Sequence, residues 1–132
     1  MKLHVKPELV FAAVALVWPS LAYAHPHVWV EMRSNLVFTA DGKIEGVSVK
    51  WTFDDAYAAE ALDGMDANGD GEYSQEELVP LTAENINALE AYDYFTVMRA
   101  EGKQLEATPP TRAGQSYTDR KLQLHFQNPW IS

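Results

Sequence analysis

Hydrophobic and polar residues alternate along the first half of the chain with the period of half-buried β-strands. In residues 27–39 the apolar side chains fall mainly on even positions, which predicts a first strand. The Asp41-Gly42 pair tolerates the positive φ that a tight hairpin turn requires. Apolar residues then take every other position from Val47 to Phe53. The sequence therefore predicts an antiparallel hairpin in this region.

The apolar spacing lengthens after the hairpin and predicts a short first helix. Asp54 or Asp55 can cap its first turn with a side-chain oxygen. Its expected apolar stripe is Tyr57, Ala58, Ala61, Leu62 and Met65.

A second helix is predicted to start at Ser74, because Ser74 and Glu77 have the spacing of a capping box. Pro80 has no amide hydrogen and is expected to bend or interrupt this helix. Its expected inner face consists of Val79, Ala83, Ile86 and Leu89.

The last third of the chain returns to strand patterns. Residues 95–100 and 103–107 predict a second hairpin, and 121–127 a further strand, whereas 108–119 is expected to be a polar loop. The expected fold class is α+β, with antiparallel β-hairpins flanking a helix-loop-helix unit at about 54–92.

The acidic segment between the two predicted helices, Asp66 to Glu77, matches the EF-hand calcium-loop pattern D-x-[DN]-x-[DN]-G-x5-E. Calcium prefers about six to eight oxygen ligands, and Gly71 stands where the loop must turn sharply. The expected ligands are the side chains of Asp66, Asn68 and Asp70, the backbone carbonyl of Glu72, Ser74 directly or through water, and bidentate Glu77. Magnesium fits less well because it demands a tighter octahedron.

The alternative for this segment is an acidic turn that binds no ion. Carboxylates crowded around one point would raise one another's pKa values unless a cation neutralised them, which favours the ion site. Tyr73 stands where EF-hands usually carry an aliphatic residue that pairs with a partner loop, and the sequence holds no second such loop. A lone loop favours stabilisation of a fold over the opening of a target groove.

The N-terminal segment has the layout of a secretory signal peptide. Lys2 and Lys6 precede an apolar run at 9–18, and small residues end at Ala24. The run is too short for a bilayer that needs about 20 helical residues, so no permanent membrane anchor is expected. Cleavage of residues 1–24 would leave 25–132 as a single periplasmic or secreted domain.

Composition excludes several partners. The net charge is −9, with 19 acidic and 10 basic residues, so nucleic acid and anionic lipid are not expected partners. The chain has no cysteine, which excludes disulfides and thiolate metal sites. The signatures of common enzyme classes are also absent from the sequence, so no enzymatic activity is expected.

His25 and His27 form a second candidate site, for nickel, cobalt, zinc or copper. After cleavage His25 would carry a free α-amine, and the two imidazoles would lie roughly 6.6 Å apart on one side of an extended chain. Pro26 excludes the square-planar chelate that needs a deprotonated second amide. The alternative is a pair of solvated polar residues. His125 shares a polar strand face and is expected to be solvated, although a copper brace with His25 would require it nearby.

The string His25-Pro26-His27-Val28-Trp29-Val30, followed by Trp51-Thr52-Phe53-Asp54, the acidic loop, Glu84-Asn85 and Tyr94-Phe95, is similar to domain of unknown function family 1007. The resemblance implies a periplasmic component of an uncharacterised transport system, an accessory to nickel, cobalt or zinc transport working with a membrane metal transporter.

The candidate sites that carry over from this family are the pair His25 and His27 and the Asp66 to Glu77 loop. Relatives continue with further strands beyond the position of Ser132, so the resemblance also implies a truncated sheet. The sequence thus predicts a periplasmic calcium-binding accessory of metal transport. The alternatives are an exported domain stapled by calcium and a secreted copper enzyme.

Overall fold

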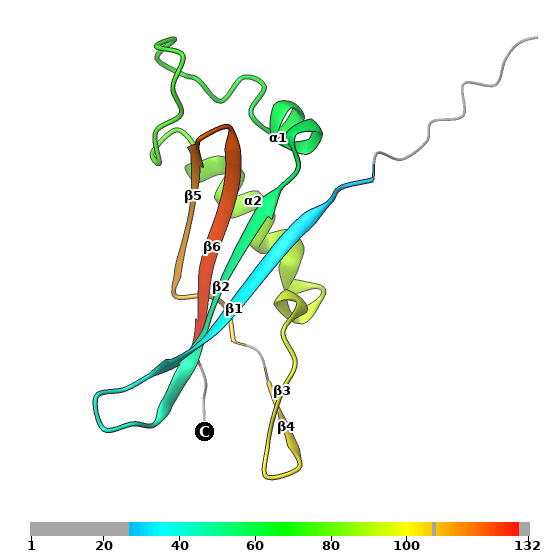
Figure 1. Ribbon diagram of the computed structural model, residues 1–132, viewed down its shortest axis with the longest axis vertical. Helices are drawn as coiled ribbons and strands as arrows, with labels where there is room; N and C mark the ends of the chain where they lie inside the picture. The colour runs from blue at the N-terminus through cyan, green and yellow to red at the C-terminus, as the bar shows by residue number, and fades with distance from the viewer. Residues whose placement is uncertain (1–26, 107, 130–132) are drawn as a thin grey trace, which may run out of the picture.

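The computed structural model describes residues 27–106 and 108–129 of the chain (Figure 1). It combines antiparallel strands with two α-helices, as expected for an α+β protein. The elements in chain order are β1 (Val30–Phe38), β2 (Ile44–Phe53), α1 (Asp55–Ala61), α2 (Val79–Glu90), the 3-10 turn η2 (Asp93–Phe95), β3 (Met98–Ala100), β4 (Lys103–Leu105), β5 (Arg112–Thr118) and β6 (Lys121–Pro129).

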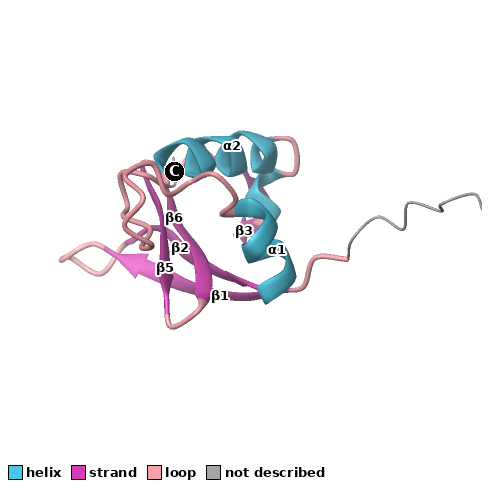
Figure 2. Ribbon diagram, turned by 90° about the horizontal axis from the view of Figure 1, so that it is seen from above, coloured by secondary structure: helices cyan, strands magenta, loops and turns pink. Residues whose placement is uncertain are grey.

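The main sheet has four strands in the order β1-β2-β6-β5, and every neighbouring pair is antiparallel. Seen from above, both helices lie on one side of this sheet (Figure 2). Helix α2 contacts β5 and helix α1 contacts β6. The predicted hairpin of β3 and β4 is confirmed and forms a separate two-stranded sheet.

The hydrophobic core lies between the helices and the inner face of the two central strands. Alternate residues of β2 and β6 point into it, which confirms the period of two read from the sequence. The buried apolar residues are Val47, Val49, Phe53, Ala58, Leu62, Leu78, Leu81, Leu89, Tyr94, Leu122, Leu124 and Phe126. Their removal from water is the main force that holds the two layers together.

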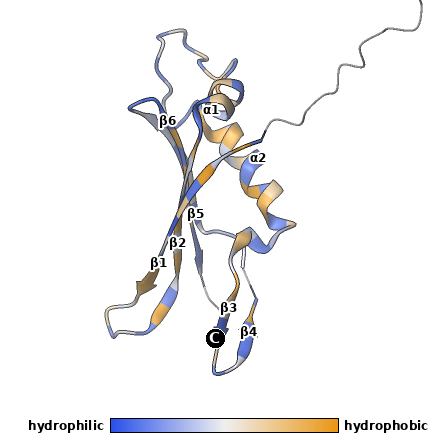
Figure 3. Cartoon of the chain, turned by 45° about the vertical axis from the view of Figure 1, so that its right-hand side comes forward, coloured by the Kyte–Doolittle hydropathy of each residue, from blue (hydrophilic) through white to orange (hydrophobic). Residues whose placement is uncertain are grey.

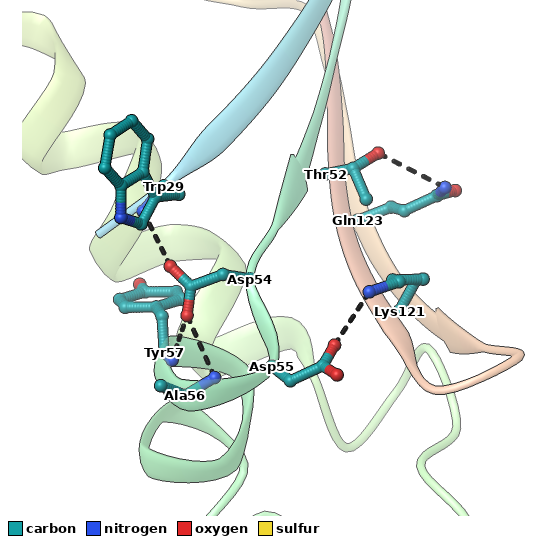
Figure 4. Close-up of polar contacts among 8 residues, drawn as sticks. All are labelled: Trp29, Thr52, Asp54, Asp55, Ala56, Tyr57, Lys121 and Gln123. Atoms are coloured by element: carbon teal, nitrogen blue, oxygen red, sulfur yellow. Dashed lines mark hydrogen bonds and ion pairs between the residues drawn. The ribbon is translucent and has the colours of Figure 1, made fainter. Parts of the chain in front are cut away.

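The Asp54 carboxylate fixes the passage from β2 into α1 (Figure 4). Its Oδ1 accepts the backbone N–H groups of Ala56 and Tyr57, both at 2.9 Å, so the predicted N-cap is confirmed. Its Oδ2 accepts the backbone N–H of Trp29 at 2.6 Å. The same carboxylate therefore caps the helix and holds the start of the first strand.

The expectation of a polar loop over 108–119 is wrong, because residues 112–118 form β5. This strand pairs with β6 along its whole length, from Arg112 opposite Gln127 to Thr118 opposite Lys121. Its sequence lacks apolar alternation, and Gln115 is its buried residue. This segment becomes a strand because it pairs with β6 at the edge of the sheet, not because of the pattern of its own residues.

The predicted start of the second helix at Ser74 is also wrong, since α2 begins at Val79. The capping-box contacts between Ser74 and Glu77 are present, but a turn separates them from the helix. Pro80 lies in the first turn of the helix. Backbone N–H groups there have no carbonyl partner within the helix, so the missing amide hydrogen costs no hydrogen bond and Pro80 does not bend the helix.

The inner face of α2 is therefore shifted from the expected one. Val79 and Ala83 are exposed, whereas Leu81, Thr82 and Leu89 are buried and Ile86 packs against the core.

The predicted signal peptide, residues 1–24, lies outside the described part of the chain. Within the described ranges, no helix has the length and apolar content needed to span a bilayer.

The position of α2 gives a direct test by alanine substitution on either side of Pro80. Leu81→Ala removes a side chain that is 5% exposed and should lower the free energy of unfolding by about 2–5 kcal/mol. Val79→Ala removes one that is 60% exposed and should change it by less than about 0.5 kcal/mol. Urea denaturation measures both, and a larger loss for Val79→Ala would contradict this helix face.

Candidate metal-binding loop

The acidic segment from Asp66 to Glu77 connects α1 to α2 and appears as the green loop at the top of Figure 1. Both of its flanks are anchored in the core. Leu62, the C-cap of α1, is 4% exposed, and Leu78, which precedes α2, is fully buried. The exposed loop is therefore held at each end by packed residues.

The first half of the loop folds around the carboxylate of Asp66. Oδ1 accepts the backbone N–H of Gly69 at 2.8 Å and that of Asp70 at 3.2 Å, and Oδ2 accepts the N–H of Gly71 at 2.9 Å. Gly71 has φ of +83°, a left-handed conformation that strains residues with a side chain. The prediction that this position needs glycine is confirmed.

The other two ligand candidates of this half contact each other. Asn68 Oδ1 accepts the N–H of Asp70, and Asn68 Nδ2 donates to Asp70 Oδ2, both at 2.9 Å. Asp70 Oδ1 accepts the N–H of Glu72 at 2.8 Å. The side-chain oxygens of Asp66, Asn68 and Asp70 thus belong to one local hydrogen-bonded turn.

Glu77 closes the loop. Its Oε1 accepts the N–H groups of Ala67 and Asn68 at 3.0 and 3.2 Å, and its Oε2 accepts the N–H and the hydroxyl of Ser74, both at 2.9 Å. A carboxylate from the end of the segment therefore lies against the backbone at its beginning. This closure is what a bidentate ligand at the last loop position requires.

The electrostatics of Glu77 differ from the expectation for crowded carboxylates. The hydrogen bonds from Ser74, first through its backbone and then its hydroxyl, and from the Asn68 amide hold the pKa of Glu77 below its ordinary value. Donors within the loop stabilise the ionised form. The predicted rise of pKa is wrong for this residue because N–H groups, rather than the other carboxylates, surround it.

Across residues 27–106 and 108–129, no three side chains of His, Asp or Glu gather in a geometry that could hold a metal ion. The loop carboxylates engage backbone N–H groups instead. The donor set nevertheless fits calcium in kind, since the side chains of Asp66, Asn68, Asp70, Ser74 and Glu77 and the carbonyl of Glu72 all offer hard oxygens.

Tyr73 packs against the main sheet. Its ring meets that of Tyr117 on β5 edge-on, with the centroids 5.4 Å apart. In a paired EF-hand this loop position would meet the partner loop, whereas here it meets a strand of the same chain. Sequence reasoning missed Tyr117 because it assigned this segment to a loop.

The histidine candidates are not brought together by the described residues. His27 is exposed, and His25 lies outside the described part, so their transition-metal pair stays a prediction. His125 is exposed on β6, opposite Gly114 and Lys50, which confirms its expected contact with solvent. Its imidazole covers Gly114, where a Cβ would approach Nε2 to 2.9 Å.

Comparison with known proteins identifies a family but no activity. Residues 10–131 match the family described as Protein of unknown function (DUF1007). A 64-residue segment, 48% of this chain, is 34% identical to an uncharacterised 15.5 kDa protein in the trpE 3′ region of Spirochaeta aurantia. The match covers 46% of that relative's length. No solved structure matches the chain.

The depressed pKa of Glu77 predicts a pH effect in calcium-free buffer. A carboxyl whose pKa is lower in the folded than in the unfolded chain stabilises the fold above its unfolded value, near 4.5, and this contribution is lost as pH falls through the lower folded value. Glu77→Gln should therefore reduce the loss of stability between about pH 5 and pH 3. Urea titrations across that range measure it.

Glu76→Gln is the matched control, because it removes a neighbouring charge that makes no side-chain hydrogen bond in the described part of the chain. If Glu77→Gln keeps the full pH slope of the unchanged protein, the loop contacts do not stabilise the ionised carboxylate.

Proposed function

Because the chain belongs to the DUF1007 family, whose function is unknown, we propose its function from the loop itself: the protein binds one calcium ion, and the ion braces the fold. The ligands would be the side chains of Asp66, Asn68, Asp70, Ser74 and Glu77 and the backbone carbonyl of Glu72.

The contact of Glu77 with the backbone of Ala67 and Asn68 carries the proposal. Twelve-residue calcium loops require the last carboxylate to approach the first half of the loop, and the Glu77 carboxylate lies against the backbone of the second and third loop residues. The carboxylates of Asp66 and Glu77 now accept N–H groups of the loop. A cation would add a much stronger attraction for the same oxygens, so it would rigidify a turn that is already formed.

A structural role is supported by the surroundings of the loop. Tyr73 rests on Tyr117 of β5, and the residues that flank the loop, Leu62 and Leu78, are in the core. An ion that binds only the folded chain stabilises it by mass action. Ordering the loop would therefore tighten the attachment of both helices to the sheet.

Export to the periplasm and an accessory role in nickel, cobalt or zinc transport are further proposals, which rest on the N-terminal segment and its histidines. Metal content after mild purification from the native compartment separates the possibilities. Calcium alone supports the bracing role, nickel, cobalt or zinc supports the transport accessory, and tightly held copper supports a secreted copper enzyme.

Isothermal titration calorimetry tests the calcium site. The unchanged protein should bind one calcium ion with a dissociation constant of roughly 0.1–1 mM, the range of extracellular modules. Calcium at a hundredfold excess over this value should add about 2.7 kcal/mol to the free energy of unfolding. Asp66→Ala and Glu77→Ala should abolish both effects, because each removes a ligand carboxylate.

Glu76→Ala is the control, since it removes the same charge next to the loop's last ligand. Unchanged calcium affinity in the Asp66→Ala, Glu77→Ala double variant would show that this loop is not the site.

The bracing role predicts an effect of Tyr117, which offers no ligand. Tyr117→Ala removes the support of Tyr73 and should weaken calcium binding a few-fold, because residues in contact couple by about 0.5 kcal/mol or more. Tyr92→Ala, which removes an exposed ring that stacks on Phe95, should leave the affinity unchanged. Equal affinity in both variants would mean that the loop binds calcium without bracing the sheet.

A further inference from the structure

Strand β1 is one edge of the main sheet, and its inner face is apolar but uncovered. Val28 and Met32 are 45% and 48% exposed, and Leu36 is 49% exposed. On the adjacent strand, Val47, Val49 and Phe53 of the same face are buried. The apolar face of the sheet therefore continues onto β1, where the described residues leave it exposed. Figure 3 marks the hydrophobic and hydrophilic residues along the strands.

An apolar groove runs along this exposed strip. It has a volume of about 420 Å³ and lies between β1 and α2. Val30 and Met32 line its β1 side, and Ala88 and Leu89 line its α2 side. The opposite edge differs, because β5 is polar in sequence and is contacted by α2. Among the described strands of the sheet, β1 is thus the edge that leaves apolar surface open.

The backbone of β1 is also available for pairing. Trp29 faces β2 with both peptide groups: its N–H donates to Asp54 Oδ2 and its C=O accepts the N–H of Asp54. Peptide groups alternate in direction along a strand, so those of Val30, Met32 and Ser34 point to the free edge. Of these residues, Val30 and Met32 carry apolar side chains on the inner face, as Leu36 does further along the strand. A strand added at this edge would both form backbone hydrogen bonds with β1 and extend the apolar face of the sheet.

We propose that a second copy of this chain pairs with β1, antiparallel and with a two-fold axis at Met32. Residues 28–36 of each copy would form the ladder. Met32 would lie opposite Met32 of the second copy, and Val28 opposite Leu36 of the second copy. This inference does not depend on the proposed calcium site.

Charge complementarity selects this arrangement. Glu31 and Arg33 lie on the outer face of β1, where the Arg33 Nη2 and Glu31 Oε1 atoms are 2.8 Å apart. An axis at Met32 puts each Glu31 directly opposite Arg33 of the second copy, at a non-hydrogen-bonded pair where the strands' side chains lie closest. Opposite charges would therefore face each other twice across the new interface.

The wider charge pattern favours the same edge. The chain carries a net charge of −9, so two copies repel at most orientations. In β1 the charges of Glu31 and Arg33 cancel, so the strand has no net charge. The register irregularity between Val37 and Phe38 ends the regular ladder on that side, which favours an axis at Met32 over one nearer the hairpin turn.

Charge reversal tests the proposed pairing by sedimentation equilibrium of the full chain. The unchanged protein should show a monomer-dimer equilibrium. Glu31→Arg and Arg33→Glu should each weaken it at least several-fold, because like charges would face each other twice. An equimolar mixture of the two variants should dimerise again, since opposite charges then face each other in the mixed dimer.

Lys43→Glu is the matched control, because it reverses a charge in the same kind of exposed pair, with Asp41, in the hairpin turn away from the ladder. It should dimerise like the unchanged protein. A monomeric unchanged protein, or a mixture that fails to recover dimers while both variants are folded, would overturn the proposal.

Cysteine cross-linking tests the register, since the chain has no native cysteine. Met32→Cys would place two thiols at a hydrogen-bonded pair with Cα atoms about 5.5 Å apart, within disulfide reach. Ser34→Cys would leave its two copies about 14 Å apart along the strand direction. Mild oxidation should therefore yield a disulfide dimer for Met32→Cys and not for Ser34→Cys. Cross-linking of Ser34→Cys alone would overturn the axis at Met32.

Discussion

The carboxylate of Asp54 is the constraint on which the rest of the structure depends. It accepts N–H groups from Ala56 and Tyr57 in the first turn of α1 and from Trp29 at the start of β1. These contacts, with that of Tyr57 the strongest and Trp29 next, hold the pKa of Asp54 below its ordinary value. Lys121 of β6 binds Asp55 at 2.8 Å beside it. Contacts from the start of β1, the end of β2 and β6 thus meet at the first turn of α1. They set the direction of this helix and therefore the position of the acidic loop that follows it.

The acidic loop inherits its position from this junction and its shape from local contacts. Asp66 and Glu77 organise it through backbone N–H groups, and every such partner lies within the segment itself. Tyr73 then joins the loop to Tyr117 of the sheet. A lone loop of this sequence pattern lacks the partner loop that usually steadies such a site. If the loop binds calcium as proposed, the contact with the sheet would take that place, which favours a brace over a sensor that must swing open.

The elements that the sequence predicted well are those whose pattern is set by their own neighbours. The apolar row of β6 expresses burial on one face of one strand, and the cap at Asp54 is a contact within four residues. The alternation over residues 27–39 predicted β1, although both faces of that strand are largely exposed. Strand β5 was not predicted because its own sequence lacks a strand pattern, and its structure is determined by pairing with β6 across a turn. The hydrogen bonds within the acidic loop join residues close in sequence, so the position of its turn glycine could be predicted. The contact of Tyr73 with Tyr117 joins residues far apart in the chain, so no local pattern indicated it.

The edge of β1 shows a limit of a different kind. Alternation indicates which face of a strand is apolar, but it does not indicate whether anything covers that face. The exposed row of Val28, Met32 and Leu36 became visible only when the sheet order placed β1 outermost.

Calcium would link the two proposals through charge alone, because its two positive charges reduce the repulsion between chains that each carry −9. That repulsion is screened beyond about 8 Å at physiological ionic strength. The opposed Glu31 and Arg33 pairs act at contact and keep more of their attraction. Pairing at β1 should therefore respond to calcium in dilute buffer and become independent of it as salt rises.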